Sequence, residues 1–334
     1  MQNQVRPLRL DLILTRICPM ACVYCHMDHR PGVMSPRVWR KAVDLLLREQ
    51  GPLELQLMGG EPLVEYDLVR EILTYAAAAA AKKRKALGLG VTTNGLLLTA
   101  KRAAELRRLG ARVMLSFDGD KDVQTAQRTQ RAGGEKFWTV LKRNLAALGA
   151  SGNPFFVNIV VTPESAGRLS QGVTFLLGQG VRAFQISYAL GVFWDEERLN
   201  ILEEELRKSY RQADAALPPA EVFNRRNDAE PVLLSPQHVV DTDGRLYVGT
   251  SIVLEHLWPA LHRSFLVGAV GKLRSFPGRG VGPQEQLRRL RAADVAGEAR
   301  RTMRNNLAVG KRMREFWKKE ILLAPGSDYR KGGR

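Results

Sequence analysis

Three cysteines lie within eight consecutive positions of this 334-residue chain, and the chain has no other thiol. Their spacing is Cys18-x3-Cys22-x2-Cys25, directly after a strand-like apolar run. An odd number of clustered thiols argues against a disulfide framework and for metal or redox chemistry. Three thiolates on a short loop reach three irons of a cubane 4Fe-4S cluster and leave the fourth iron open, which is what chemistry at the metal requires.

A second motif, Met58-Gly59-Gly60-Glu61-Pro62, lies at the end of the next apolar run. A ligand's ammonium needs acceptors; glycines let backbone carbonyls approach it closely, and Pro62 stiffens the turn. The alternative for the cysteines is a zinc site completed by His26 or His29. The second motif favours the open cluster over the zinc site.

The two motifs, together with the aromatic Tyr24 before the last cysteine, resemble the radical S-adenosylmethionine superfamily. The resemblance implies that the three cysteines bind one 4Fe-4S cluster, whose open iron chelates the methionyl end of S-adenosylmethionine. It also implies reductive cleavage to methionine and a 5′-deoxyadenosyl radical that abstracts hydrogen from the substrate, with flavodoxin or ferredoxin as electron donor. The implied cofactor-binding residues in these motifs are Tyr24, Gly59, Gly60, Glu61 and Pro62.

Further candidates follow the next two strand-like runs. Thr93-Asn94-Gly95 and Ser116-Phe117-Asp118-Gly119 end those runs, where parallel βα folds place ligands; ordinary turn chemistry is the alternative. Arg128 falls where related peptide-modifying enzymes carry an arginine, which would pair with the methionyl carboxylate. The signature before it departs from the family pattern, because proline, histidine and aspartate are replaced by Asp120, Gln124 and Thr125. The resemblance adds Asn94, Ser116, Asp118 and Arg128 to the cofactor-binding candidates.

These motifs need a scaffold of parallel strands whose carboxyl ends meet. Apolar runs of strand length alternate with amphipathic helical stretches, which is the pattern of βα units. Six such units are fewer than the eight of a closed barrel. The sequence therefore predicts an α/β fold, a partial (β/α)6 radical SAM barrel, with strands at 8–14, 53–58, 89–93, 112–117, 155–162 and 182–188. Helices are expected at 36–50, 66–86, 135–148 and 195–216. A further helix is expected to begin near residue 100, and another to end near residue 177.

A different pattern follows the sixth unit. Pro218 and Pro219 mark a boundary, and β-prone runs around Asp243-Gly244 predict a hairpin over 237–248. This hairpin resembles the SPASM extension of peptide- and protein-modifying radical S-adenosylmethionine enzymes, such as sulfatase maturases and maturases of ribosomally made peptides. The predicted domains are the barrel core at 1–217, a degenerate SPASM-like extension at 218–280 and a basic helical tail at 281–334.

The auxiliary-cluster cysteines of that extension are absent. Gly249 and Thr250 stand just after Tyr247, where the family has its first auxiliary ligand. The chain therefore holds thiol ligands for one cluster only and has no spare thiol to donate hydrogen to a substrate radical. Tyr188 and Tyr247 are candidate catalytic substitutes, and a hydrogen-bonded structural tyrosine is the alternative for each.

Charge adds a further constraint. The formal net charge is +17, and the residues from Pro283 onward contain 14 Lys and Arg against 6 Asp and Glu. Such a surface attracts an acidic partner, although solvated helix faces are an equal explanation. We expect an enzyme that dehydrogenates, cross-links or rearranges a peptide or protein substrate with an acidic leader. One alternative is modification of nucleic acid, although the sequence has no recognisable nucleic-acid-binding module. The other is a non-catalytic protein that keeps the fold only to bind a peptide or a partner protein.

The remaining composition is that of a globular protein. Hydrophobic residues make up 45% of the chain, which is enough for a large core. No uninterrupted apolar stretch approaches the roughly 18 residues of a membrane span, and the N-terminus lacks a signal-peptide pattern. We therefore expect a cytoplasmic protein without membrane contact.

Overall fold

The computed structural model describes residues 7–131, 136–226, 231–277 and 281–323. Within these ranges the main sheet has ten strands in the order β12-β11-β10-β1-β3-β4-β5-β7-β8-β9. Its central strands are parallel to their neighbours, as a series of βα units requires. They are β1 (Leu8–Ile13), β3 (Leu53–Met58), β4 (Leu87–Thr93), β5 (Ala111–Ser116), β7 (Phe155–Val161) and β8 (Ala183–Tyr188).

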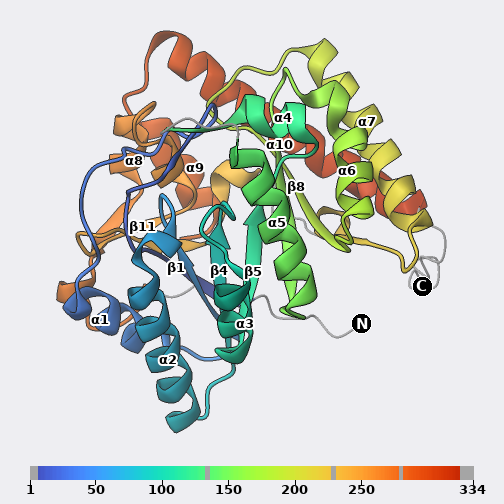
Figure 1. Cartoon of the computed structure of the whole chain (residues 1–334). Helices are drawn as coiled ribbons and strands as arrows, with labels where there is room; N and C mark the ends of the chain where they lie inside the picture. Colours follow the sequence, from blue (N-terminus) through green and yellow to red (C-terminus); the bar gives the residue numbers. More distant parts are fainter. Residues whose placement is uncertain (1–6, 132–135, 227–230, 278–280, 324–334) are drawn as a thin grey trace, which may run out of the picture.

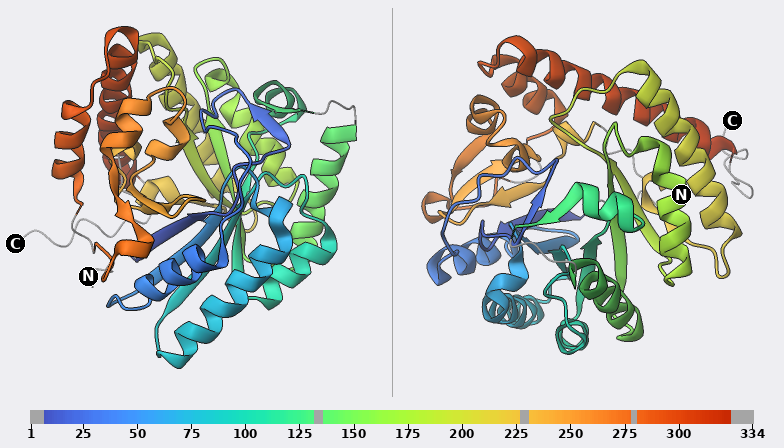
Figure 2. Two further views of the ribbon diagram at one scale, coloured as in Figure 1. Left: turned by 90° about the vertical axis from the view of Figure 1, so that its left-hand side faces the viewer. Right: turned by 45° about the horizontal axis from the view of Figure 1, so that its top comes forward.

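Helices between these strands cover the outer face of the sheet, which curves around an open interior (Figure 1; Figure 2). The fold is α/β, a partial barrel of six βα units, as the predicted fold class requires. The short helix α4 was not expected, and residue 135, where one helix was expected to begin, lies outside the described ranges. The helices are α1 (Pro36–Leu46), α2 (Tyr66–Lys82), α3 (Ala100–Arg108), α4 (Lys121–Gln127), α5 (Lys136–Ala150), α6 (Leu169–Gly178) and α7 (Glu196–Ala215).

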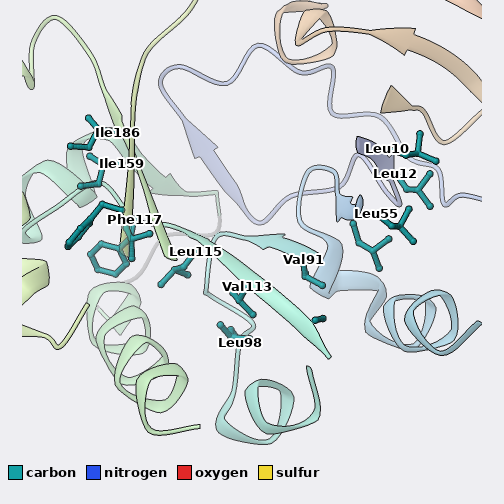
Figure 3. Close-up of a cluster of buried hydrophobic side chains, with 14 of the residues drawn as sticks. Leu10, Leu12, Leu55, Val91, Leu98, Val113, Leu115, Phe117, Ile159 and Ile186 are labelled. Carbon is teal, nitrogen blue, oxygen red and sulfur yellow. The ribbon is translucent and has the colours of Figure 1, made fainter. Parts of the chain in front are cut away.

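The two faces of the sheet differ in polarity because side chains alternate along each strand. Apolar side chains on one face pack against the helices; Figure 3 shows this cluster, which includes Leu55, Val91 and Val113. The aromatic rings of Phe117 and Trp138, the latter on α5, pack there with centroids 5.8 Å apart. On the other face, Ser187 Oγ donates to Asn158 Oδ1 across neighbouring strands (2.9 Å). The polar face lines the interior of the partial barrel.

The predicted C-terminal hairpin is confirmed, but its attachment was not foreseen. β10 (His238–Val240) pairs antiparallel with β11 (Arg245–Val248) and also lies parallel to β1, with His238 opposite Leu10. The hairpin therefore extends the barrel sheet at its β1 edge. The remaining strands are β9 (Glu221–Val222), which lies beside β8, and β12 (Leu266–Ala269), which lies beside β11. The predicted domain boundaries near 217 and 280 stay predictions.

The last helices lie beside this hairpin and across the β8 side of the sheet (Figure 2). They are α8 (Pro259–Ser264), α9 (Pro283–Ala292) and α10 (Gly297–Leu323). Within the described ranges, no helix combines the length and apolar composition that crossing a bilayer requires. Short 3-10 turns complete the structure: η1 (Pro62–Glu65), η2 (Ala166–Arg168), η3 (Phe223–Arg226), η4 (Val232–Leu234), η5 (Ser251–Leu254) and η6 (Val270–Lys272).

Candidate functional site: the cysteine loop

The three cysteines lie in the loop that leaves the carboxyl end of β1. Part of this loop forms β2 (Met20–Cys22), which pairs antiparallel with β6 (Arg128–Gln130), so Cys22 lies opposite Arg128. The backbone N–H of Val23 donates to the Gln127 carbonyl (2.9 Å) and extends the pairing. All three thiols are half-buried and none forms a disulfide.

Each thiol faces a different polar side chain. Asn94 Nδ2 lies 3.6 Å from Cys18 Sγ, and Arg128 Nη1 lies 3.9 Å from Cys22 Sγ. His29 Nε2 lies 3.7 Å from Cys25 Sγ, while its other ring nitrogen is 2.8 Å from the Arg16 carbonyl oxygen. The loop thus presents three separate sulfurs, each with a polar neighbour that stabilises negative charge on sulfur.

Burial dominates the electrostatics of two of the three thiols. Burial raises the pKa of Cys18 to about 12 and also raises the pKa of Cys22. Burial is the largest single effect on Cys25 and acts upward, but the hydrogen bonds from His29 and the Met27 backbone N–H, together with the nearby charges of His29 and Arg128, outweigh it, and the pKa of Cys25 is lowered. Bound iron deprotonates such thiols. Among the described residues no group of three or more His, Cys, Asp or Glu side chains is arranged around a single metal ion's position.

The Gly-Gly-Glu-Pro turn lies against the start of this loop. The backbone N–H of Gly60 donates to the Thr15 carbonyl and that of Glu61 to the Ile17 carbonyl, both at 2.9 Å. A Cβ at Gly59 would overlap the Thr15 carbonyl oxygen, and a Cβ at Gly60 would lie 2.5 Å from the Ile17 carbonyl oxygen. The two glycines are therefore required by the close approach of the β1 loop, in addition to any ligand contact.

Glu61 is fully buried and connects the ends of two strands. Its carboxylate accepts hydrogen bonds from Thr93 Oγ1 (2.8 Å) and the backbone N–H of Asn94 (2.7 Å), just after β4. It also accepts from the Leu63 N–H (3.0 Å) in η1, which begins at the buried Pro62. Burial raises the pKa of Glu61 to about 7, against the lowering effect of these hydrogen bonds. Glu61 thereby fixes the Asn94 side chain beside Cys18.

Asp118, which follows β5, is the centre of a buried polar network. It accepts from Tyr24 Oη (2.7 Å) and from Arg128 through Nε (2.9 Å) and Nη2 (3.1 Å). Gln127 Nε2 and the Val160 N–H also donate to it, at 2.9 and 3.0 Å. Arg128 lies over the Tyr24 ring, 5.3 Å from its centroid. The network aims the Arg128 Nη1 group at Cys22.

One residue that departs from the family signature contributes directly to this network, and another caps the neighbouring helix. Gln124, in the position expected for histidine, is fully buried, and its Oε1 accepts from the backbone N–H of Asp118 (2.7 Å). Asp120 caps α4 by accepting from the backbone N–H groups of Asp122 and Val123, both at 3.1 Å. The altered signature therefore still positions Asp118 and Arg128.

Three of the predicted residues are not joined to the cysteines by any described contact. Ser116 ends β5 without a side-chain hydrogen bond among the described residues. Tyr188 is buried at the end of β8, close to Gly310 of α10. Tyr247 lies on β11, where its ring stacks on His262 at a centroid distance of 4.1 Å.

Sequence reasoning missed the group that anchors the loop to the C-terminal hairpin. Arg16 is fully buried and forms a bidentate ion pair with Asp241 (2.9 and 2.6 Å). Its Nη1 also contacts Glu255 (2.6 Å), and the backbones of His26 and His256 are hydrogen-bonded (2.9 Å). The only sequence signal was an arginine directly after an apolar strand, and nothing local identifies partners more than 200 residues away.

Comparison with known proteins gives the class of this site. Residues 12–169 match the Radical SAM superfamily, and the chain carries a radical SAM domain. It is 28% identical over 263 residues to the PqqA peptide cyclase of Methylocella silvestris, covering 77% of this chain and 61% of that protein. It is also 38% identical over 121 residues to a GTP 3',8-cyclase of Parasynechococcus marenigrum, about a third of each chain.

Solved structures with the same fold include two proteins with a bound peptide. One is anSMEcpe with bound AdoMet and the Cp18Cys peptide (TM-score 0.72, 16% identity, covering 95% of this chain and 98% of that one). The other is Streptococcus suis SuiB bound to its precursor peptide SuiA (TM-score 0.55, 15% identity, covering 75% and 61%). The chain spans about 60% of the length of the first curated relatives that it matches.

Proposed function

We propose that this protein is a radical S-adenosylmethionine enzyme that modifies a peptide or protein. The observation that carries the proposal is the loop of three separate free thiols at the carboxyl ends of the parallel strands, inside a radical SAM domain. The similarity to PqqA peptide cyclases supports a peptide as substrate. The modification belongs to the class of dehydrogenation, cross-linking or rearrangement at an unactivated carbon.

The residues present fit the cofactors that this class uses. Cys18, Cys22 and Cys25 would hold one 4Fe-4S cluster, and the three thiols of the chain supply ligands for no second cluster of this type. The chemistry supplied when cluster and S-adenosylmethionine are bound is reductive cleavage to a 5′-deoxyadenosyl radical, which takes a hydrogen atom from the substrate. Flavodoxin or ferredoxin would supply the electron.

The chain's own residues position these groups. Asn94 and Arg128 each direct a nitrogen toward one cysteine sulfur, and Asp118 holds Arg128 in place. Arg128, with one guanidinium nitrogen free of Asp118, would pair with the methionyl carboxylate. The turn at Gly59 to Pro62, with Tyr24 and Ser116, would contribute the remaining cofactor contacts.

The test is anaerobic reconstitution with iron and sulfide, followed by reduction in the presence of S-adenosylmethionine. We expect about four irons per chain, an EPR signal that changes when S-adenosylmethionine is added, and formation of 5′-deoxyadenosine. Cys22→Ala should abolish 5′-deoxyadenosine formation. Iron content well below four per chain, or full activity of Cys22→Ala, would refute the proposal, and about eight irons would refute the single cluster.

Modification of nucleic acid is the second candidate, favoured by the net charge of +17. When a protein binds phosphates electrostatically, the logarithm of its binding constant falls steeply and linearly with the logarithm of the salt concentration. Titrating salt against binding of a labelled RNA and of a labelled peptide separates the two candidates, because only the RNA should lose affinity with that steep slope.

A further inference from the structure

A groove of about 750 Å³ lies between α9, α10 and η4, outside the cysteine loop. Its floor is apolar and includes Leu290 and Leu307, and its rim carries five cations, Arg291, Arg300, Arg304, Lys311 and Arg314. None of the described residues that line it is acidic or aromatic. The groove therefore combines apolar contact area with a cluster of positively charged side chains.

The cations of the groove differ from others on the same helix. Arg312 of α10 is neutralised by Glu196 and Glu203 of α7, both at 2.6 Å. By contrast, Arg304 and Lys311 form no ion pair or side-chain hydrogen bond with any residue that the structure describes. Charge that Arg312 directs toward α7 is thus balanced within the protein, whereas the charges of Arg304 and Lys311 in the groove are available to a ligand.

The spacing of these cations suits an elongated ligand. Arg300, Arg304, Lys311 and Arg314 recur at helical spacing on one face of α10, so the stripe extends about 21 Å along the helix. An extended peptide of about six residues has the same length. A nucleic acid strand is a poorer fit, because the lining offers no aromatic ring on which bases stack.

The groove is also coupled to the cysteine loop through one connection. On another face of α10, Asn306 accepts from the Gly191 N–H (2.8 Å) and donates to the Val192 carbonyl (2.7 Å) in the segment after β8. A Cβ at Gly191 would lie 3.0 Å from the ring of His26, next to Cys25. The helix that forms one wall of the groove is therefore connected, through the segment after β8, to the cysteine loop.

We infer that the groove between α9 and α10 binds an acidic segment of the peptide substrate in which apolar side chains alternate with carboxylates. The inference rests on the proposed function, since it assigns the recognition segment of the peptide that the enzyme modifies. Leucine-sized side chains fill the apolar floor, and carboxylates pair with Arg304 and Lys311. The modified residue lies elsewhere in the same peptide.

The test uses the reconstituted full chain and a fluorescein-labelled peptide of Glu-Ser-Leu repeats, with binding followed by anisotropy at physiological salt. The double variant Arg304→Glu/Lys311→Glu should weaken binding by about tenfold or more, because attraction becomes repulsion. The matched variant Lys101→Glu/Arg108→Glu makes the same charge change on exposed positions of α3 and should retain affinity within about twofold, since salt screens distant charges.

Three outcomes would overturn the inference. One is equal weakening in the two double variants, which would indicate attraction by bulk charge. Another is equal affinity for a Glu-Ser-Ser repeat peptide, which would leave the apolar floor without a role. The third is tighter binding of a single-stranded RNA that is lost in Arg304→Glu/Lys311→Glu, which would assign the groove to nucleic acid.

The proposed function is read out separately. Cleavage of S-adenosylmethionine without peptide should persist in Arg304→Glu/Lys311→Glu, because neither residue contacts the cysteine loop. If the unaltered protein forms no 5′-deoxyadenosine, the proposed function fails while the binding data still decide what the groove holds.

Discussion

The Asp118 carboxylate accepts hydrogen bonds from Tyr24, Gln127, Arg128 and the Val160 N–H. Substitution of Asp118 should therefore affect both stability and activity. Removing one partner of a buried ion pair leaves the other charge uncompensated. Asp118→Asn keeps the shape but leaves the Arg128 guanidinium buried without a carboxylate. We expect the free energy of unfolding, measured with urea, to fall by about 3 kcal/mol. Formation of 5′-deoxyadenosine should also fall, because Arg128 loses its orientation toward Cys22.

Asp122→Asn is the matched control for this change. Asp122 lies on α4, and its exposed side chain pairs with Arg168 at 3.3 Å. Exposed pairs contribute less than about 1 kcal/mol, so this variant should keep its stability and activity. Equal losses in both variants would show that the buried network around Asp118 has no special role.

His238 gives the protein a pH-dependent stability. It is buried on β10, its ring packs on Phe276 at 4.7 Å, and neither ring nitrogen has a hydrogen-bond partner among the described residues. Burial lowers the pKa of His238 to about 4. In the unfolded chain His238 binds a proton near pH 6.5, whereas in the folded chain it stays neutral down to about pH 4. The free energy of unfolding therefore decreases as the pH falls from 6.5 toward 4.

The measurement is urea unfolding of the unaltered chain and of His238→Leu between about pH 7 and pH 4.5. The unaltered chain should lose up to about 1.4 kcal/mol per pH unit more than the variant in this window. Parallel pH profiles for the two proteins would contradict the assignment to His238.

At the scale of elements, Arg16 attaches the cysteine loop to the C-terminal hairpin. Arg16→Met and Asp241→Leu should each lower the free energy of unfolding by about 3–5 kcal/mol, because each leaves a buried charge. Each should also reduce the iron retained after reconstitution, since Arg16 lies two residues before Cys18. The double variant leaves no unpaired partner of this ion pair and should be more stable than the sum of the two losses predicts. Strict additivity would mean that the pair is not coupled.

Most barrel elements could be predicted because their signal is local. The six parallel strands were expected within two residues of their observed ends, since apolar runs and turn residues mark them directly. The pairing of β10 with β1 could not be predicted, because strand register over more than 200 residues leaves no local pattern. The cysteine motif identified the loop. The steric reason for a glycine at position 60, beside the Ile17 carbonyl, could be recognised only from the positions of the backbone atoms.

At the scale of the whole molecule, ligand binding should stabilise the folded chain. A ligand that binds only the folded state adds about 2.7 kcal/mol when its concentration is 100 times its Kd. The reconstituted protein should therefore unfold at a temperature that rises with S-adenosylmethionine concentration. Cys22→Ala, which loses one predicted iron ligand, should show no such rise. An equal rise in both proteins would place S-adenosylmethionine binding away from the cluster loop.

The pairing of β1 with β10 has a consequence for biosynthesis. Arg16 finds Asp241 and Glu255 only after the ribosome has made more than 200 further residues. At about 5–20 residues per second, roughly 10–50 s separate the appearance of Cys25 from that of Glu255. During that interval the thiols lack their final surroundings and are open to oxygen and stray metals. Iron loading in the cell should therefore be most reliable when the cluster is delivered after the hairpin has been translated.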